Sequence, residues 1–126
     1  MLQADRTARV APSRVETRPS RVERFTAVVA LHGQHDLASR EEVRVALASL
    51  RCDLLLDLSD CTFIDSTVIG TIMKAARTLA SQGYRLELVL PPPDSQVAKT
   101  LALVGLPDLL GAHADLASAD ANGPDS

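Results

Sequence analysis

Apolar runs separated by polar turns predict three buried strands along the chain. Residues 25–33, FTAVVALHG, are β-branched and apolar and end at a glycine, which predicts a strand. Residues 53–59, DLLLDLS, are almost continuously apolar, as expected for a buried parallel strand. Residues 84–90, YRLELVL, alternate in hydropathy, and three prolines end this strand because proline cannot donate to a sheet. A shorter strand is predicted at 13–18.

Between these strands the apolar residues recur at helical spacing. The first predicted helix starts at Ser39 and Glu42, which have the spacing of a capping box. A second helix starts at Asp65 and ends at Gly83, the usual glycine of a helix C-terminus. Its apolar stripe, expected in the core, consists of Ile69, Ile72, Met73, Ala76, Leu79 and Ala80. A third helix is predicted over 95–105.

This order of strands and helices predicts an α/β fold, with a single, mostly parallel sheet flanked by helices and joined by right-handed crossovers. The domain is expected to span residues 13–116. Residues 1–12 are rich in arginine and lack apolar periodicity, so we expect a flexible N-terminal tail. Residues 117–126 lack it as well, and we expect a disordered C-terminal tail.

Two loops should meet at one edge of this sheet. Loops at the carboxyl ends of parallel strands gather on the same edge, where binding sites are built. The strand that ends near Gly33 delivers residues up to Asp36 to that edge, and the next strand delivers residues 59–66. We therefore expect Asp36 to lie close to Asp65 and Ser66.

The composition is that of one domain with an aliphatic core. Of the 126 residues 46% are hydrophobic, but only Phe25, Phe63 and Tyr84 are aromatic. Residues 1–24 hold six arginines and three acids, a net charge of +3, whereas residues 25–126 hold seven basic and thirteen acidic side chains, a net charge of −6. Because nucleic-acid binding needs clustered positive charge, we expect no direct nucleic-acid partner.

The chain is expected to be cytoplasmic. It contains no 18-residue apolar run that could span a membrane, and residues 1–25 hold no apolar segment of signal-peptide length. Cys52 and Cys61 flank one predicted strand and should lie about 20 Å apart, too far for a disulfide. Two reduced thiols fit a cytoplasmic protein.

The sequence carries no pattern for catalysis or for a metal. It has no glycine-rich phosphate loop, and His32, His35 and His113 have no partners at ligand spacing, so we expect no metal site and no cofactor. Ser66 lacks the G-x-S-x-G context of a hydrolase nucleophile, and the acid before it would raise the pKa of its hydroxyl. We therefore do not expect an enzyme.

Residues 63–70, FIDSTVIG, place two hydroxyls directly behind an acid at the start of the second helix. Asp65 is expected to cap that helix by accepting hydrogen bonds from backbone N–H groups of the next turn, worth about 1 kcal/mol. Ser66 and Thr67 then lie on the first exposed turn. They are either parts of the helix start or a site of modification, and the physics of the sequence leaves both interpretations open.

The segment DLSDCTFIDSTVIG resembles the signature of STAS domains, the family of bacterial anti-sigma factor antagonists and sulphate-transporter tails. The family signature has D-L-S, three residues, an apolar pair and then D-S-[ST]-G-x-G. The matching residues are Asp57, Leu58, Ser59, Phe63, Ile64, Asp65, Ser66, Thr67 and Gly70. HGQHDLAS is similar to the family's G-x-[LI]-D-x-[AS] element through Gly33 and Asp36. The resemblance covers about residues 25–110, with Val68 in place of the usual glycine and His35 in place of an aliphatic residue.

The resemblance implies a mostly parallel STAS-like sheet with an antiparallel edge strand, and a binding module controlled by phosphorylation. The family's serine at the position of Ser66 is phosphorylated by an anti-sigma factor that is itself a serine kinase, and Thr67 is the alternative acceptor here. The unphosphorylated protein would bind that anti-sigma factor and be released on phosphorylation, and a serine phosphatase would be a further partner. The alternative function is that of the STAS subunit of a lipid-transporting ABC complex.

The expected partner-binding surface starts at Ser66 and follows the second helix. Its residues are Gly33, Asp36, Asp65, Ser66, Thr67, Val68, Thr71 and Ala75. Because the apolar stripe of that helix should fill the core, Val68, Thr71 and Ala75 are expected to form a second, exposed stripe. On this expectation Val68→Asp weakens partner binding and leaves the free energy of unfolding within about 0.5 kcal/mol.

Overall fold

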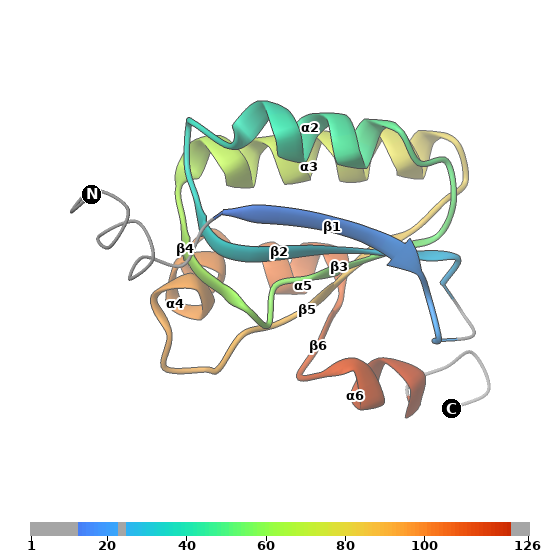
Figure 1. The fold of residues 1–126 in the computed structure, drawn as a ribbon. Coiled ribbons are helices and arrows are strands. Elements are labelled where there is room, and N and C mark those ends of the chain that lie inside the picture. Colours follow the sequence, from blue (N-terminus) through green and yellow to red (C-terminus); the bar gives the residue numbers. More distant parts are fainter. Residues whose placement is uncertain (1–12, 23–24, 122–126) are drawn as a thin grey trace, which may run out of the picture.

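The computed structural model of the protein describes residues 13–22 and 25–121, which form an α/β fold around one sheet (Figure 1). The strands are β1 (Arg14–Pro19), β2 (Ala27–His35), β3 (Leu54–Asp57), β4 (Cys61–Ile64), β5 (Leu86–Val89) and β6 (Ala112–His113). They are ordered β1-β2-β3-β5-β6, and β4 pairs with β2. β1 is antiparallel to β2, and the other described pairs are parallel. The predicted single, mostly parallel sheet with an antiparallel edge strand is confirmed.

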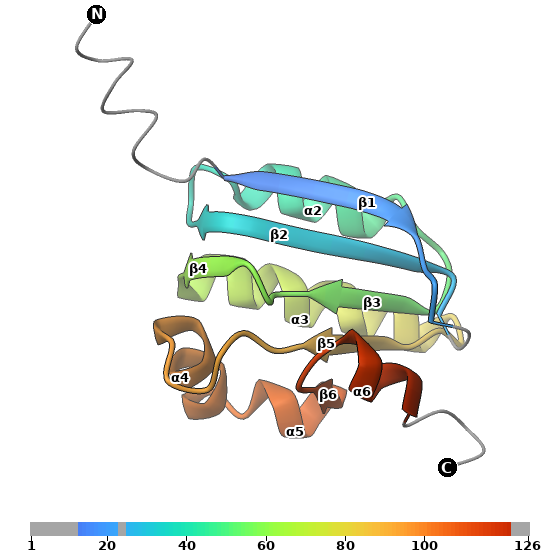
Figure 2. The ribbon, with the colours of Figure 1, turned by 60° about the horizontal axis from the view of Figure 1, so that its bottom comes forward.

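The helices cover the two faces of the sheet unequally. They are α2 (Arg40–Ala48), α3 (Ser66–Ser81), α4 (Gln96–Leu103), α5 (Leu106–Leu110) and α6 (Leu116–Ala121). α2 and α3 lie side by side over one face (Figure 1), whereas α6 lies over the opposite face (Figure 2). The main core, which includes Val29, Leu56 and Ile72, packs the sheet against α2 and α3. Burying each of these side chains contributes about 1.5–3 kcal/mol, so this aliphatic layer fixes how α3 lies on the sheet.

β2 is longer than predicted, and β4 was not predicted at all. β2 does not end at Gly33 but continues to His35, and β4 pairs with this extension. The register shifts between Gly33 and Gln34, and Gly33 has a φ of 81°, which favours glycine. The glycine therefore marks an irregularity inside the strand rather than its end.

Ser39 does not form the predicted capping box. It is the N-cap residue of α2, but its side chain accepts no cap hydrogen bond from that helix. Its hydroxyl instead lies 3.1 Å from Nδ1 of the buried His35 and donates to the carbonyl oxygen of Asp36 at 3.3 Å. The buried imidazole needs a polar partner, and Ser39 supplies it in place of a helix cap.

The end of α3 follows the prediction more closely. Gly83 has a φ of 86°, its N–H donates to the carbonyl of Ala80 at 3.0 Å, and the N–H of Tyr84 donates to the carbonyl of Leu79 at 2.9 Å. These bonds form a Schellman motif, which satisfies the last carbonyls of the helix. Ala80, however, is exposed and does not belong to the core stripe as predicted.

The C-terminal boundary predicted at residue 116 is wrong. Residues from Leu116 to Ala121 form α6, and Ala119 is 0% exposed, in a second apolar cluster with Val28 and Leu55 of the sheet. The sequence concealed this because one small residue, rather than a periodic stripe, anchors the helix. The predicted tail at 1–12 and the last part of the C-terminal tail, 122–126, lie outside the described residues.

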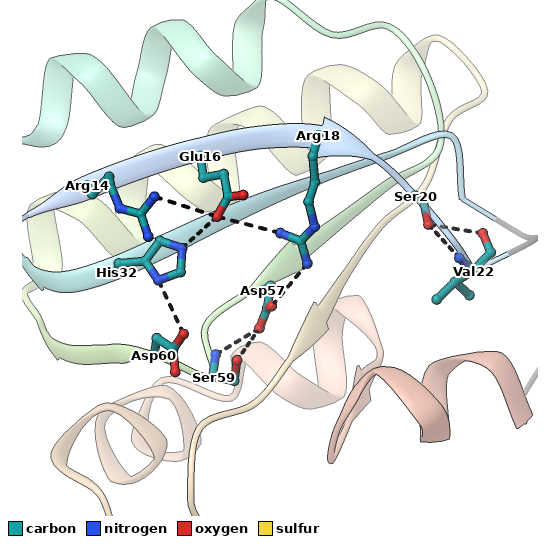
Figure 3. Close-up of polar contacts among 9 residues, drawn as sticks. All are labelled: Arg14, Glu16, Arg18, Ser20, Val22, His32, Asp57, Ser59 and Asp60. Atoms are coloured by element: carbon teal, nitrogen blue, oxygen red, sulfur yellow. Dashed lines mark hydrogen bonds and ion pairs between the residues drawn. The ribbon is translucent and has the colours of Figure 1, made fainter.

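The face of the sheet opposite α2 and α3 also carries a polar network (Figure 3). Nε2 of His32 lies 2.9 Å from a carboxylate oxygen of Glu16, and its Nδ1 lies 3.3 Å from one of Asp60. The hydrogen bond from His32, followed by nearby arginines, lowers the pKa of Glu16. Arg18 lies 3.8 Å from both Glu16 and Asp57. These contacts tie β1, β2 and the β3–β4 loop together.

Candidate functional site

The start of α3 and the loop after β2 lie at the same edge of the sheet. In the β2–β4 pair, His35 is the register partner of Ile64, and the N–H of Asp65 donates to the carbonyl of His35 at 3.3 Å. Asp36 and Asp65 are the residues that directly follow this pair. The predicted proximity of the two loops is therefore confirmed, and β4 is the element that produces it.

Asp65 caps α3 as predicted. One carboxylate oxygen, Oδ1, accepts from the backbone N–H groups of Thr67 and Val68, each at 3.1 Å, and from the hydroxyl of Thr67 at 2.7 Å. The Thr67 hydroxyl, then the backbone amides of Val68, Thr67 and Leu37, lower the pKa of Asp65. The backbone of Asp65 also links this cap to β2, because its N–H donates to the carbonyl of His35.

The two hydroxyls behind Asp65 differ in their surroundings. Ser66, the first residue of α3, is exposed, and within residues 13–22 and 25–121 its side chain makes no hydrogen bond. The Thr67 hydroxyl is held by Asp65, in the bond described above. Of these two hydroxyls, that of Ser66 is the one that no described residue holds.

Val68 does not lie on the predicted surface stripe. Its side chain is 0% exposed and packs in the main core with Ile69 and Ile72. Thr71 and Ala75 are half-buried and thus partly accessible, as expected. The prediction failed because α3 packs against α2 as well as against the sheet, and Val43 and Leu47 of α2 belong to the same core cluster as Val68. Gly33 is buried too, so it shapes β2 instead of offering surface.

Two exposed apolar side chains at this edge were missed by the sequence analysis. Leu37 is 62% exposed and Phe63 is 38% exposed. Leu37 directly follows Asp36, and Phe63 pairs with Gln34 just before Asp65. Both flank the start of α3, and large apolar side chains exposed near a polar site favour an interaction surface. The signal available in the sequence was that Phe63 is one of only two phenylalanines.

The Asp65 cap leads to a first prediction. Asp65→Ala should lower the free energy of unfolding by about 1 kcal/mol at neutral pH, the usual value of an N-cap. Since folding lowers the pKa of this carboxyl, its stabilisation is present above the unfolded pKa of about 4 and is lost as the pH falls through the lower folded value. Urea unfolding between about pH 7 and pH 2.5 measures this.

The control for the cap is Asp94→Ala, because Asp94 is exposed and Ser95 is the N-cap residue of α4. We expect that variant to unfold within about 0.5 kcal/mol of the wild type at all these pH values. A difference between Asp65→Ala and the wild type that persists unchanged at the lowest pH would show that the carboxylate is not the source of the effect.

The described residues form no metal centre and no disulfide. No group of three or more His, Cys, Asp or Glu among them could hold a metal ion. Cys52 and Cys61 are both free thiols, and burial raises the pKa of Cys61 to about 11. No described helix is long and apolar enough to cross a membrane.

The side chains that are accessible at this edge are hydroxyl, carboxylate and apolar groups.

The fold is that of a STAS domain. A family profile described as "Mlab, STAS domain" matches residues 21–111, and the chain belongs to the STAS domain family. No curated protein matches the sequence.

Solved structures share the fold at low sequence identity. An anti-sigma factor antagonist from Mycobacterium paratuberculosis is 17% identical, with 86% of this chain and 91% of that chain covered and a TM-score of 0.69. The Bacillus cell fate determinant SpoIIAA in its phosphorylated form is 21% identical, with coverages of 87% and 98% and a TM-score of 0.60. The anti-sigma factor antagonist SpoIIAA in its unphosphorylated form is 20% identical, with coverages of 76% and 83% and a TM-score of 0.56.

Proposed function

We propose that this protein is an anti-sigma factor antagonist that works by partner switching. In its unphosphorylated form it binds an anti-sigma factor of the serine-kinase type, and phosphorylation of Ser66 releases it. The observation that carries the proposal is the free, exposed Ser66 hydroxyl at the first residue of α3, beside a Thr67 hydroxyl that is held by Asp65. A kinase can reach Ser66 without first breaking a hydrogen bond within the described residues.

The proposed partner surface is the exposed part of the same edge. It consists of Asp36, Leu37, Phe63, Asp65, Ser66, Thr67, Thr71 and Ala75. Leu37 and Phe63 supply exposed apolar area at the edge that carries Ser66. The kinase activity and ATP belong to the partner, and a serine phosphatase restores the unphosphorylated form.

Structural likeness to anti-sigma factor antagonists supports this function. The fold matches anti-sigma factor antagonists over most of their length, and SpoIIAA has been solved in phosphorylated and unphosphorylated forms. We infer that phosphorylation regulates this chain as well, in the cytoplasm and without a catalytic role of its own. The alternative, a STAS subunit of a lipid-transporting ABC complex, requires a stable complex that does not depend on modification of Ser66.

The second prediction is that the cognate serine kinase and ATP place phosphate on Ser66. Mass spectrometry of the digested protein should find the modified residue there. Thr67→Val removes the competing hydroxyl but keeps the β-branched shape, and this variant should still be modified, whereas Ser66→Ala should not. Phosphate found on Thr67 alone, or on neither residue in a kinase-bound sample, would contradict the proposal and favour the alternative.

A further inference from the structure

A groove of about 640 Å³ is lined by residues of α2 and α3 and of the segments that follow them. Its accessible apolar lining includes Ala48, Leu50 and Ala75. It begins beside Thr67, the residue after the free Ser66 hydroxyl, and reaches Gln82 at the end of α3. The groove therefore continues from the proposed phosphorylation site along the whole length of α3.

The rim of the groove is positively charged, although the rest of the domain is acidic. Four cationic side chains line it: Arg40, Arg44, Arg51 and Lys74. Residues 25–126 contain only seven lysines and arginines and thirteen acids, and none of the acids lines the groove. Arg44 is paired with Glu41 of its own helix, whereas Arg40, Arg51 and Lys74 form no ion pair within the described residues. Three unpaired cations thus face the solvent along one channel.

The shape of the groove fits a helix. The residues that α3 contributes recur at helical spacing and are mostly short: Thr67, Gly70, Thr71, Lys74, Ala75, Thr78 and Gln82. A Cβ atom built at Gly70 would meet nothing within 4 Å, so the space above it is open. Short side chains let a neighbouring helix approach closely, and the 16 residues of α3 offer about 24 Å, or four turns, for contact.

We propose that this groove binds an acidic amphipathic helix of the partner, with its apolar face on Ala48, Leu50 and Ala75 and its carboxylates beside Arg40, Arg51 and Lys74. The inference rests on the proposed function, because Thr67, Thr71 and Ala75 belong to both surfaces. The partner thus holds the chain at two adjoining places: the Ser66 edge, which phosphorylation changes, and the groove, which supplies charge-matched binding along α3.

The test uses a labelled 14-residue peptide, designed to place leucines on one helix face and glutamates on the other, and measures its binding to the full chain by fluorescence anisotropy. Reversing two rim charges, in Arg40→Glu/Lys74→Glu, should weaken binding about tenfold or more. The matched control is Arg77→Glu/Lys99→Glu, which makes the same change in net charge at cations outside the groove. It should change the affinity less than about threefold, because salt screens distant charges.

A steric variant tests the same groove without changing charge. Gly70→Leu should leave the circular dichroism spectrum and the unfolding midpoint intact or improved, since leucine is a better helix former than glycine, but it should fill the groove and abolish peptide binding. Four results would each overturn the inference. The control pair could weaken binding as much as the rim pair does, or Gly70→Leu could bind the peptide undiminished. A peptide with glutamine in place of glutamate could bind equally well, or the acidic peptide could fail to bind up to about 1 mM.

The two proposals can fail separately. If the kinase phosphorylates Ser66 but the chain does not bind the acidic peptide, the proposed phosphorylation switch stands and the proposed groove interaction is refuted. If the chain binds the peptide with the expected charge dependence but is never phosphorylated, the groove interaction stands and the switch is refuted.

Discussion

Val68→Asp should lower the free energy of unfolding by about 4 kcal/mol or more, enough to leave much of the protein unfolded. Val68 is fully buried in the main core, between α3 and the sheet. The substitution removes the stabilisation of a buried valine, about 1.5–3 kcal/mol, and puts a carboxyl group where no polar partner is available. Urea unfolding followed by circular dichroism measures the loss.

The control for Val68→Asp introduces the same side chain on an exposed face of the same helix. Thr78→Asp should unfold within about 0.5 kcal/mol of the wild type, because Thr78 is exposed and the two residues have similar helix propensities. If Val68→Asp were no less stable than this control, Val68 would be a surface residue after all. Loss of partner binding by Val68→Asp must not be taken as proof of an interface, since unfolding alone produces it.

Ser66→Asp should weaken binding of the anti-sigma factor about a hundredfold, whereas Ser66→Ala should bind as the wild type does. A phosphate adds a charge of about −1.5 to −2 at neutral pH, and the aspartate reproduces part of it. Asp65 and Asp36 already make this edge negative, so a partner surface built for a neutral hydroxyl must accept and desolvate a further anion. A loss of about 3 kcal/mol corresponds to more than a hundredfold in the dissociation constant.

The matched control for this pair is Ser81→Asp, the same replacement at the far end of α3. Ser81 is exposed and lies outside both the Ser66 edge and the groove. Isothermal titration of each variant with the purified partner gives the affinities directly. Equal affinities for the alanine and aspartate variants at position 66, or an equal loss in Ser81→Asp, would show that charge at Ser66 does not control binding.

Much of this fold could be predicted from local patterns. The continuous apolar run before Asp57 gave a buried parallel strand, and the Gly83 cap marked the end of α3, because both depend on short-range physics. β4 could not be predicted in the same way. Only Cys61 and Ile64 of its four residues are buried, and it forms because β2 continues past its glycine and offers free backbone groups.

The candidate site could be predicted only in part. The cap at Asp65 follows from residue type and position, and it was found. Whether a hydroxyl is free or hydrogen-bonded depends on the direction of its side chain. The sequence therefore could not show that Thr67 is bonded to Asp65 and that Ser66 is not. The burial of Val68 depends on tertiary packing, because Val68 lies in a core cluster that also contains Val43 and Leu47 of α2, and the pattern of α3 alone does not show this. Asp60 was expected near Ser66, but it lies beside His32 on the other face of the sheet (Figure 3).

The Asp65 carboxylate also bears on how fast the proposed switch can work. It already accepts hydrogen bonds from the amides of Thr67 and Val68, so these two donors are not available to a phosphate on Ser66. We therefore do not expect the phosphate to bind back onto the start of α3. The N–H of Asp65 also donates to the carbonyl of His35, so the start of α3 is already fixed to the end of β2, and we expect neither to rearrange when the group is added or removed. With no slow conformational step inside the domain, the time course of the response is set by the kinase, the phosphatase and the dissociation of the partner.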